Sequence, residues 1–193
     1  MKHIRMFLFF MLMLSLSNLK AQQNVAVTAI FPKNICQSYQ NDGMSSVKIE
    51  YKISGLSNEA AQAFNTKALK NDKVVSSNVA TNLSQGLRVG KLEITAQTDF
   101  DYIKNIFVEG GIAFVHIEDV IMPIEDWKAF TAEQCSKITQ LNLNIENIEF
   151  KLNYTQNNPT QKAMAESNGW FTEAYDLLNK AKEAKINYVE SIK

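Results

Sequence analysis

The sequence is poor in glycine, proline, cysteine and histidine. Its 193 residues include seven glycines and three prolines, together about 5%, where an average protein has about 12%. This composition excludes a collagen-like or low-complexity chain. Hydrophobic residues make up 46% and charged residues 21%, which is the balance of a globular protein and not of a disordered one. The length suits one compact domain, or one domain with an extension.

An excess of one charge sign is also missing. The 20 Lys and Arg residues balance the 20 Asp and Glu residues, so the formal net charge is 0. A protein that binds nucleic acid usually carries a basic excess, so we expect no nucleic-acid partner. The sequence has no Gly-x-Ser-x-Gly, no His-Glu-x-x-His, no phosphate-binding glycine loop and no dinucleotide fingerprint. We therefore expect no enzyme activity and no cofactor, although a hydrolase with two carboxylates needs no sequence motif.

The first 21 residues have the three-part layout of a secretory signal. Lys2 and Arg5 precede the uncharged apolar run 6–16, and residues 17–21 are mostly small or polar. The apolar run is shorter than the ~20 residues that a spanning helix needs, so we expect cleavage near Ala21 and no integral membrane insertion. An uncleaved anchor is the alternative. After cleavage, 17 basic and 20 acidic residues remain, with a net charge of −3, in an exported protein of the periplasm or the exterior.

Alternating apolar residues and helix caps predict the local structure from residue 25 onward. A short strand over 25–31 precedes a polar loop. There follow a strand at 47–53, a helix at 57–70, strands at 74–83 and 87–96, a helix at 98–109 and a strand at 112–122. Ser57 is a good N-cap for the first helix, and Thr98 and Asp101 have the spacing of a capping box for the second, with Asp in place of the usual Glu. The apolar positions change parity within the strand 87–96, which predicts a β-bulge at Gly90. The β-α-β-β-α-β order is that of the ferredoxin-like fold, an antiparallel sheet with both helices on one face.

Residues 123–193 predict a helical and strand extension. Thr131 and Gln134 have the spacing of a capping box for a helix that reaches about residue 140. Residues 141–154 fit both strand alternation and helical spacing. We favour a strand there, because Asn and Ile are frequent and both are modest helix formers. A long helix then begins at Asn158-Pro159, with an interruption at Asn168-Gly169.

The expected protein is therefore of the α+β class and has four parts. These are a signal peptide (1–21), an N-terminal strand and loop (22–46), a ferredoxin-like domain (47–122) and a C-terminal extension with a long helix (123–193).

Three features of residues 47–116 occur together in one known family. Gly55-Leu56 follows the first strand, a turn and strand occupy 71–79, and the helix within 99–111 ends in glycine. In these features the segment resembles a heavy-metal-associated domain, the small copper- or zinc-chaperone module of ferredoxin-like fold. That family holds its metal with a Cys-x-x-Cys pair, and here Asn58 and Ala61 stand at the two cysteine positions. Neither offers a thiolate to a soft metal, so the resemblance implies the fold and not the metal transfer.

Cys36 and Cys135 are the only cysteines in the chain. An exported protein meets an oxidising compartment, where the two would form a disulfide. The alternative is a pair of buried thiols. The sequence leaves both alternatives open, because it does not show whether the two Cα atoms come within bridging distance.

His116 is the only histidine outside the signal segment, and Glu118 and Asp119 follow it closely. His116 and Glu118 are therefore weak candidates for a metal site. A structural role in the strand is the favoured interpretation, because Glu118 and Asp119 are adjacent and would point to opposite faces of a sheet, so that both could not join His116 on one metal ion.

Two other groups have a structural interpretation that is stronger than a functional one. Asp99 and Asp101 suit a helix start, where carboxylates cap backbone N–H groups, better than they suit a cation site. The aromatic pair Trp170-Phe171 suits a hydrophobic core better than a platform for a ligand.

Two functional hypotheses follow from these observations. The first is an exported, non-enzymatic protein that binds an unknown protein or small ligand, or forms a homo-oligomer through its C-terminal helix. The alternative is an exported copper- or zinc-handling protein that uses substitute ligands, either His116 with Glu118 or Cys36 with Cys135.

Overall fold

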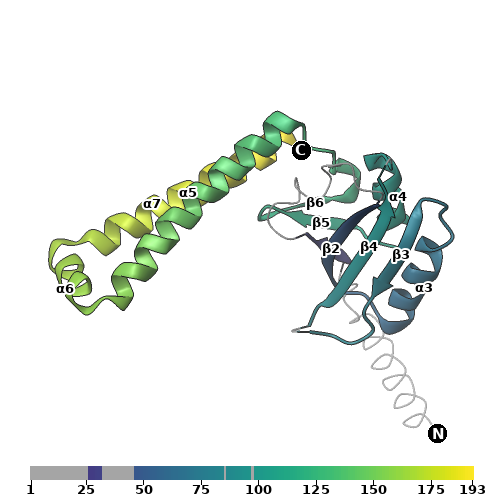
Figure 1. Cartoon of the computed structure of the whole chain (residues 1–193), viewed down its shortest axis with the longest axis horizontal. Coiled ribbons are helices and arrows are strands. Elements are labelled where there is room, and N and C mark those ends of the chain that lie inside the picture. Colours follow the sequence, from purple (N-terminus) through teal and green to yellow (C-terminus); the bar gives the residue numbers. More distant parts are fainter. Residues whose placement is uncertain (1–25, 32–45, 85, 97) are drawn as a thin grey trace, which may run out of the picture.

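The computed structural model describes residues 26–31, 46–84, 86–96 and 98–193 (Figure 1). The predicted signal segment lies outside these residues. In chain order the elements are β1 (Thr28–Ile30), β2 (Ser46–Ser54), α3 (Asn58–Ala68), β3 (Val74–Val79), β4 (Arg88–Thr95), α4 (Phe100–Glu109), β5 (Phe114–Ile117), β6 (Val120–Pro123), the 3₁₀ turn η1 (Ile124–Asp126), α5 (Ala132–Asn157), α6 (Pro159–Asn168) and α7 (Trp170–Ile192). The elements from β1 to η1 form a body, and α5, α6 and α7 form a helical arm that projects from it (Figure 1).

The predicted α+β class is confirmed, but the strand order differs from that of the expected ferredoxin-like sheet. The described strands form one sheet in the order β3-β4-β2-β1-β5-β6. In a ferredoxin-like sheet the strands that correspond to β2 and β5 would be neighbours, whereas here β1 lies between them. Strand β1 is antiparallel to β2 and parallel to β5, so the sheet is mixed and not antiparallel. Its central residue, Ala29, is fully buried between Ile53 and Val115.

The predicted last strand, 112–122, is a hairpin of two short strands. Strands β5 and β6 pair in antiparallel register, and Glu118 and Asp119 form the turn between them. Both turn residues have positive φ, 51° and 70°, as a two-residue type I′ turn requires. The sequence concealed this turn, because such turns usually contain Asn or Gly and this one contains neither.

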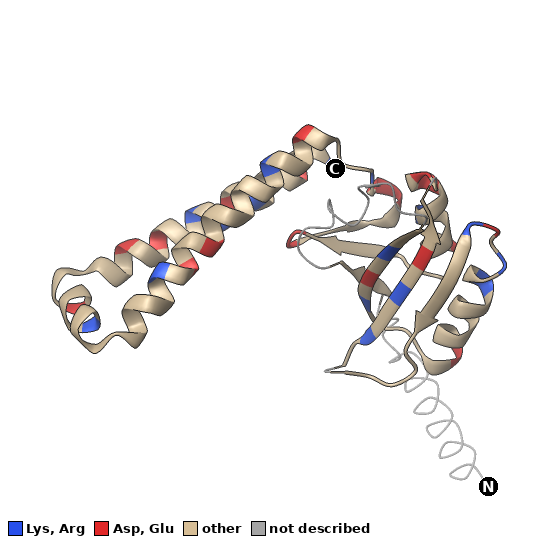
Figure 2. Ribbon diagram, in the orientation of Figure 1, with Lys and Arg blue, Asp and Glu red and all other residues tan. Residues whose placement is uncertain are grey.

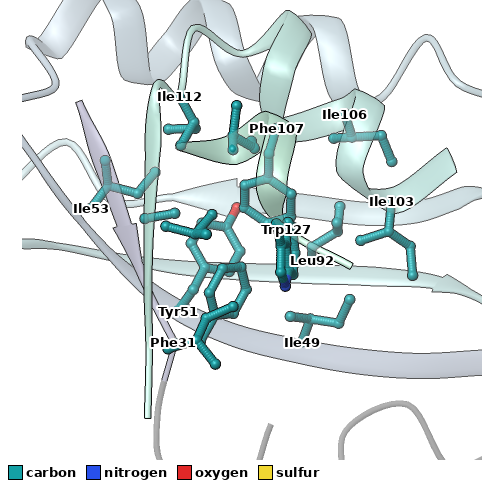
Figure 3. Packing of buried hydrophobic residues seen from close by; sticks show 14 of the residues in the cluster. Phe31, Ile49, Tyr51, Ile53, Leu92, Ile103, Ile106, Phe107, Ile112 and Trp127 are labelled. Atoms are coloured by element: carbon teal, nitrogen blue, oxygen red, sulfur yellow. The ribbon is translucent and has the colours of Figure 1, made fainter. Parts of the chain in front are cut away.

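Aromatic rings fill the space between the sheet and the two helices of the body (Figure 3). Phe107 of α4 packs edge-on against Tyr51 of β2, with ring centroids 4.9 Å apart. Phe64 of α3 lies 5.8 Å from Phe107. Both helices therefore cover the same face of the sheet, as predicted. On the opposite face, the exposed side chains of Glu50 and Lys91 form an ion pair with a nitrogen–oxygen distance of 2.8 Å. Figure 2 shows residues of both charge signs along the strands of the sheet.

The predicted bulge at Gly90 is wrong. The register between β2 and β4 is continuous from Ser46 to Ile53, and Gly90 lies opposite Tyr51. A Cβ atom on Gly90 would lie only 2.2 Å from the Tyr51 ring. Glycine stands here because the ring lies directly on the strand backbone, which is the other common reason for glycine in a strand. The irregularity in this part of the sheet occurs instead in β3, between Val74 and Ser76.

Most of the predicted helix caps are confirmed. The Thr131 hydroxyl accepts from the Gln134 N–H, and the Gln134 side chain accepts from the Thr131 N–H, so α5 begins with a capping box. The predicted box at Thr98 is wrong, because Asp99 caps α4. The Asp99 carboxylate accepts from the Tyr102 N–H at 2.7 Å.

The predicted strand at 141–154 is wrong, because these residues belong to the 26-residue helix α5. Ile145 and Leu152 face α7, while Leu143 and Phe150 lie on the opposite side of α5 and are exposed. A helix with apolar residues on two opposite faces shows an alternation that imitates a strand. The predicted interruption at 168–169 is confirmed, since α6 ends at Asn168 and is capped by Gly169, which has a φ of 78°.

The arm is attached to the body at its base and has its own hydrophobic cluster farther out. Ile138 of α5 and Val189 of α7 belong to the core of the body. The outer cluster consists of Ile145, Ile148, Leu152, Ala174, Leu178 and Ala181. Among the described helices, none combines the length and apolarity needed to cross a membrane.

Candidate functional site

A pocket opens in the body near the start of the arm. Its volume is about 220 Å³. The lining residues are Val47, Ile94, Thr95, Ala96, Thr98, Phe100, Ile103, Trp127, Lys128, Ala129, Phe130 and Cys135. They come from β2, β4, α4, α5 and the segments that follow β4 and η1. The pocket is therefore a property of the folded tertiary structure and of no single sequence segment.

Trp127 forms the best-supported wall of the pocket. Its buried ring packs edge-on against Phe100, with ring centroids 4.8 Å apart. The centroid of the Phe31 ring lies 4.9 Å from that of Trp127, and Figure 3 labels both residues. The ammonium group of Lys104 donates to the Glu125 carbonyl at 2.5 Å and to the Trp127 carbonyl at 3.0 Å. These contacts fix the segment between η1 and α5, so this wall of the pocket is formed before any ligand binds.

Polar groups in the pocket are few. The hydroxyl oxygens of Thr95 and Thr98 lie 3.0 Å apart, and the Thr98 hydroxyl donates to the Thr95 carbonyl at 2.8 Å. Lys128 is the charged residue among the described lining residues, which include no carboxylate and no imidazole. A mainly apolar and aromatic lining with a few polar groups is typical of a pocket that binds a small ligand.

A second polar arrangement lies buried where the arm meets the body. The Lys185 ammonium of α7 lies 2.5 Å from the Asp119 carboxylate and 3.5 Å from the Glu118 carboxylate. The Asn142 side chain of α5 donates to Glu118 at 2.9 Å. Lys185 is 0% exposed, and Glu118 and Asn142 are also buried. These contacts join both long helices of the arm to the β5–β6 turn.

This second arrangement contains one of the two candidate metal ligands. Glu118 already faces the Lys185 ammonium, which repels a cation. His116 lies half-buried on β5, paired in register with Ile30 and Ile121. The described residues contain no group of three His, Cys, Asp or Glu side chains that could hold a metal ion. A metal site at His116 and Glu118 therefore stays a prediction, and no contact among the described residues supports it.

Only one of the two cysteines lies within the residues that the structure describes. Cys135 lies in the first turn of α5, lines the pocket and is disulfide-bonded. Cys36, the other cysteine of the sequence, lies outside the described residues. The pairing of Cys36 with Cys135 therefore stays a prediction.

The remaining predicted groups have structural roles. Asp99 caps α4, and Asp101 follows in its first turn. The rings of Trp170 and Phe171 pack edge-on, 5.4 Å apart, against the outer cluster of the arm.

Sequence reasoning missed Lys185 and Asn142, and one signal could have revealed the lysine. Leu178, Ala181 and Val189 follow the spacing of a buried helix face, and Lys185 occupies the position between them. A charged residue at a core position predicts a buried partner of opposite charge.

An exposed row of side chains follows the side of α5 that faces away from α7. We call Leu143, Asn147, Phe150 and Tyr154 the outer row. Leu143 is 53% exposed, Phe150 69% and Tyr154 54%, and the rings of Phe150 and Tyr154 stack at 6.4 Å. Large apolar side chains grouped in this way are typical of an interaction surface.

No protein-family model matches the chain, and no curated protein or solved structure matches it. The functional argument therefore depends on the geometry alone, and the resemblance to a heavy-metal-associated domain stays a prediction.

Proposed function

We propose that this chain is an exported, non-enzymatic interaction protein whose arm pairs with the arm of a second copy. The outer row on α5 is the observation that carries this proposal. The signal-like N-terminus supports the export, and the mainly apolar and aromatic pocket supports a role in binding. The partner is argued from the pattern of residues along α5.

The outer row has the spacing of a coiled-coil seam. Leu143 and Phe150 are seven residues apart and take the d positions of a heptad, while Asn147 and Tyr154 take the a positions. Asparagine at an a position is a common determinant of a parallel, two-stranded pairing in register. The same helix thus has one face for α7 and another for a second α5.

Charge complementarity supports a second copy of the chain as the occupant. In the same heptad, Glu146 takes a g position and Lys151 the following e position. In a parallel pair, a g residue meets the e residue of the partner helix five positions later, so each dimer would contain this ion pair twice. Neither side chain has an ion-pair partner among the described residues.

The mass of the chain from residue 22 onward in solution tests the proposal. Size-exclusion chromatography with light scattering should give twice the mass of one chain. Phe150→Lys should give a monomer, because it places a charge at the centre of the seam. Ile121→Lys is the matched control, since Ile121 is 62% exposed on β6 and should leave the dimer intact. A monomeric wild-type chain would contradict the proposal.

A charge exchange tests the pairing register. Glu146→Lys should weaken the dimer, because two lysines would then face each other at each pair. The double variant Glu146→Lys/Lys151→Glu should restore it. Equal dimer stability in the single and double variants would show that the outer row pairs differently or not at all.

A further inference from the structure

We infer that the pocket beside Trp127 binds a small aromatic carboxylate. This inference is independent of the pairing of the arms, because no residue of the outer row lines the pocket. It depends on the size of the pocket, the chemistry of its walls and the charge among its lining residues.

The size of the pocket fits one aromatic ring with a short substituent. A dry cavity of about 150 Å³ is large enough to bind benzene. The pocket measures about 220 Å³, so a benzene ring leaves room for a further group of a few atoms. A larger ligand with two fused rings and a long chain would exceed this space.

The walls favour an aromatic guest. Phe100, Trp127 and Phe130 supply three aromatic side chains, and Val47 and Ile94 supply aliphatic ones. Aromatic rings gain from offset or edge-to-face contacts beyond the burial of apolar area. Because Lys104 and the core hold the Trp127 segment in place, such a guest would not need to order this wall when it binds.

The charge of the pocket favours an anion. Lys128 is the charged group among the described lining residues, and it has no ion-pair partner in the part of the chain that the structure describes. Thr95 and Thr98, which also line the pocket, carry neutral hydroxyl groups. An ammonium group with hydroxyl neighbours and aromatic walls suits a ligand with a carboxylate and one ring.

Phenylacetate is a suitable probe, with phenethylamine as its cationic counterpart. The chain contains two tryptophans, so the variant Trp170→Phe leaves Trp127 as the only indole reporter. Titration of this variant should change the Trp127 fluorescence saturably with phenylacetate. Phenethylamine should bind about tenfold more weakly, because Lys128 repels its ammonium group. Equal affinities for the two probes, or no saturable change, would overturn the inference.

Two variants test whether the ligand binds in this pocket. Lys128→Gln should weaken phenylacetate binding by up to about fivefold, the range of an exposed ion pair, whereas Lys52→Gln on the open sheet should leave it unchanged. Ala129→Phe should abolish binding, because the larger side chain fills the pocket from an exposed position. Its circular dichroism spectrum serves as the check on folding. Unchanged binding in a folded Ala129→Phe variant would show that the probe binds elsewhere.

Discussion

Lys185 is a cation in a place where a cation is costly. Its ammonium group has lost its water, and the carboxylates of Glu118 and Asp119 replace that water only because the β5–β6 turn presents both of them. A buried ion pair contributes little net stability compared with apolar residues, yet removal of one partner leaves a charge buried in the low-dielectric interior. Its value here lies in fixing the arm to one position on the body.

Lys185→Met should therefore lower the free energy of unfolding by about 3–5 kcal/mol, since the Glu118 carboxylate stays buried without the lysine charge. Urea unfolding followed by circular dichroism measures this change. Lys182→Met is the matched control on the same helix. It breaks the 2.9 Å pair with Glu149, which is partly exposed, and should cost no more than about 1 kcal/mol. Equal costs in the two variants would contradict the buried role of Lys185.

Tyr51 raises a second question at the residue scale, because its hydroxyl group is buried with no hydrogen-bond partner among the described residues. Burial also raises the pKa of the Tyr51 phenol well above its usual value of about 10. Above this pH the unfolded chain loses the Tyr51 proton while the folded chain keeps it. The unfolded state then binds fewer protons, so stability falls as the pH rises.

Tyr51→Phe should remove this dependence. Between about pH 10 and pH 11, the wild-type free energy of unfolding should fall by up to about 1.4 kcal/mol more than that of the variant. At pH 7 the variant should be at least as stable, because it lacks an unpaired buried hydroxyl. Urea unfolding at pH 7, 9, 10 and 11 measures both effects. Tyr154→Phe, on the exposed outer row, is the control and should keep the wild-type dependence of the free energy of unfolding on pH. The same dependence in Tyr51→Phe would refute the argument.

At the scale of the element, the sequence correctly predicted those features that depend only on residues close together in the chain. The caps at Ser57 and Thr131 depend on a hydroxyl group and residues within three positions, so the sequence is sufficient to locate them. Helix α5 was mistaken for a strand beyond residue 140, because one of its apolar faces meets α7 and the other is exposed. A periodicity argument assumes one apolar face, and tertiary packing decides how many there are.

Thr131→Ala should lower the free energy of unfolding by about 1 kcal/mol, the usual contribution of an N-cap hydroxyl. Thermal unfolding followed at 222 nm measures the loss. Thr172→Ala, at an exposed position near the start of α7, should change stability by less than about 0.5 kcal/mol. If Thr131→Ala has an equally small effect, the first turn of α5 is held by other contacts.

Strand β1 illustrates a different limit of sequence reasoning. It has only three residues, and it pairs with β2 nearby and with β5 more than 80 residues away in the chain. A local pattern predicts a strand but not the strands that pair with it. The expected ferredoxin-like order depended on the assumption that β1 lies outside the sheet formed by residues 47–122. The candidate pocket was equally hidden, since its lining residues come from three separate stretches of the chain, Val47, 94–103 and 127–135.

At the scale of the whole molecule, a disulfide would join Cys36, which lies outside the described residues, to the base of the arm. We predict that Cys36 pairs with Cys135 within one chain, closing a loop of about 100 residues and adding up to about 4–5 kcal/mol of stability. Urea unfolding with and without reductant measures this difference. Mass spectrometry of an unreduced digest should find the two cysteine peptides linked. Alkylation of two free thiols in the unreduced protein would contradict the pairing.

The two hydrophobic clusters make the outer arm separable from the body. Residues 147–180 contain part of the outer cluster but none of the core of the body, the pocket lining or the Lys185 contacts. Their replacement by a short Gly-Ser loop should leave a folded body with the thermal transition of its strands preserved, because each cluster is packed within itself.

This shortened chain also distinguishes the two proposed activities. It should be a monomer, since Phe150 and Tyr154 are removed, and it should keep its affinity for phenylacetate, since the pocket is untouched. Light scattering and isothermal titration calorimetry on the same sample measure the two results. A shortened chain that still forms dimers would place the interface on the body, and one that folds but loses the ligand would place the binding site on the arm.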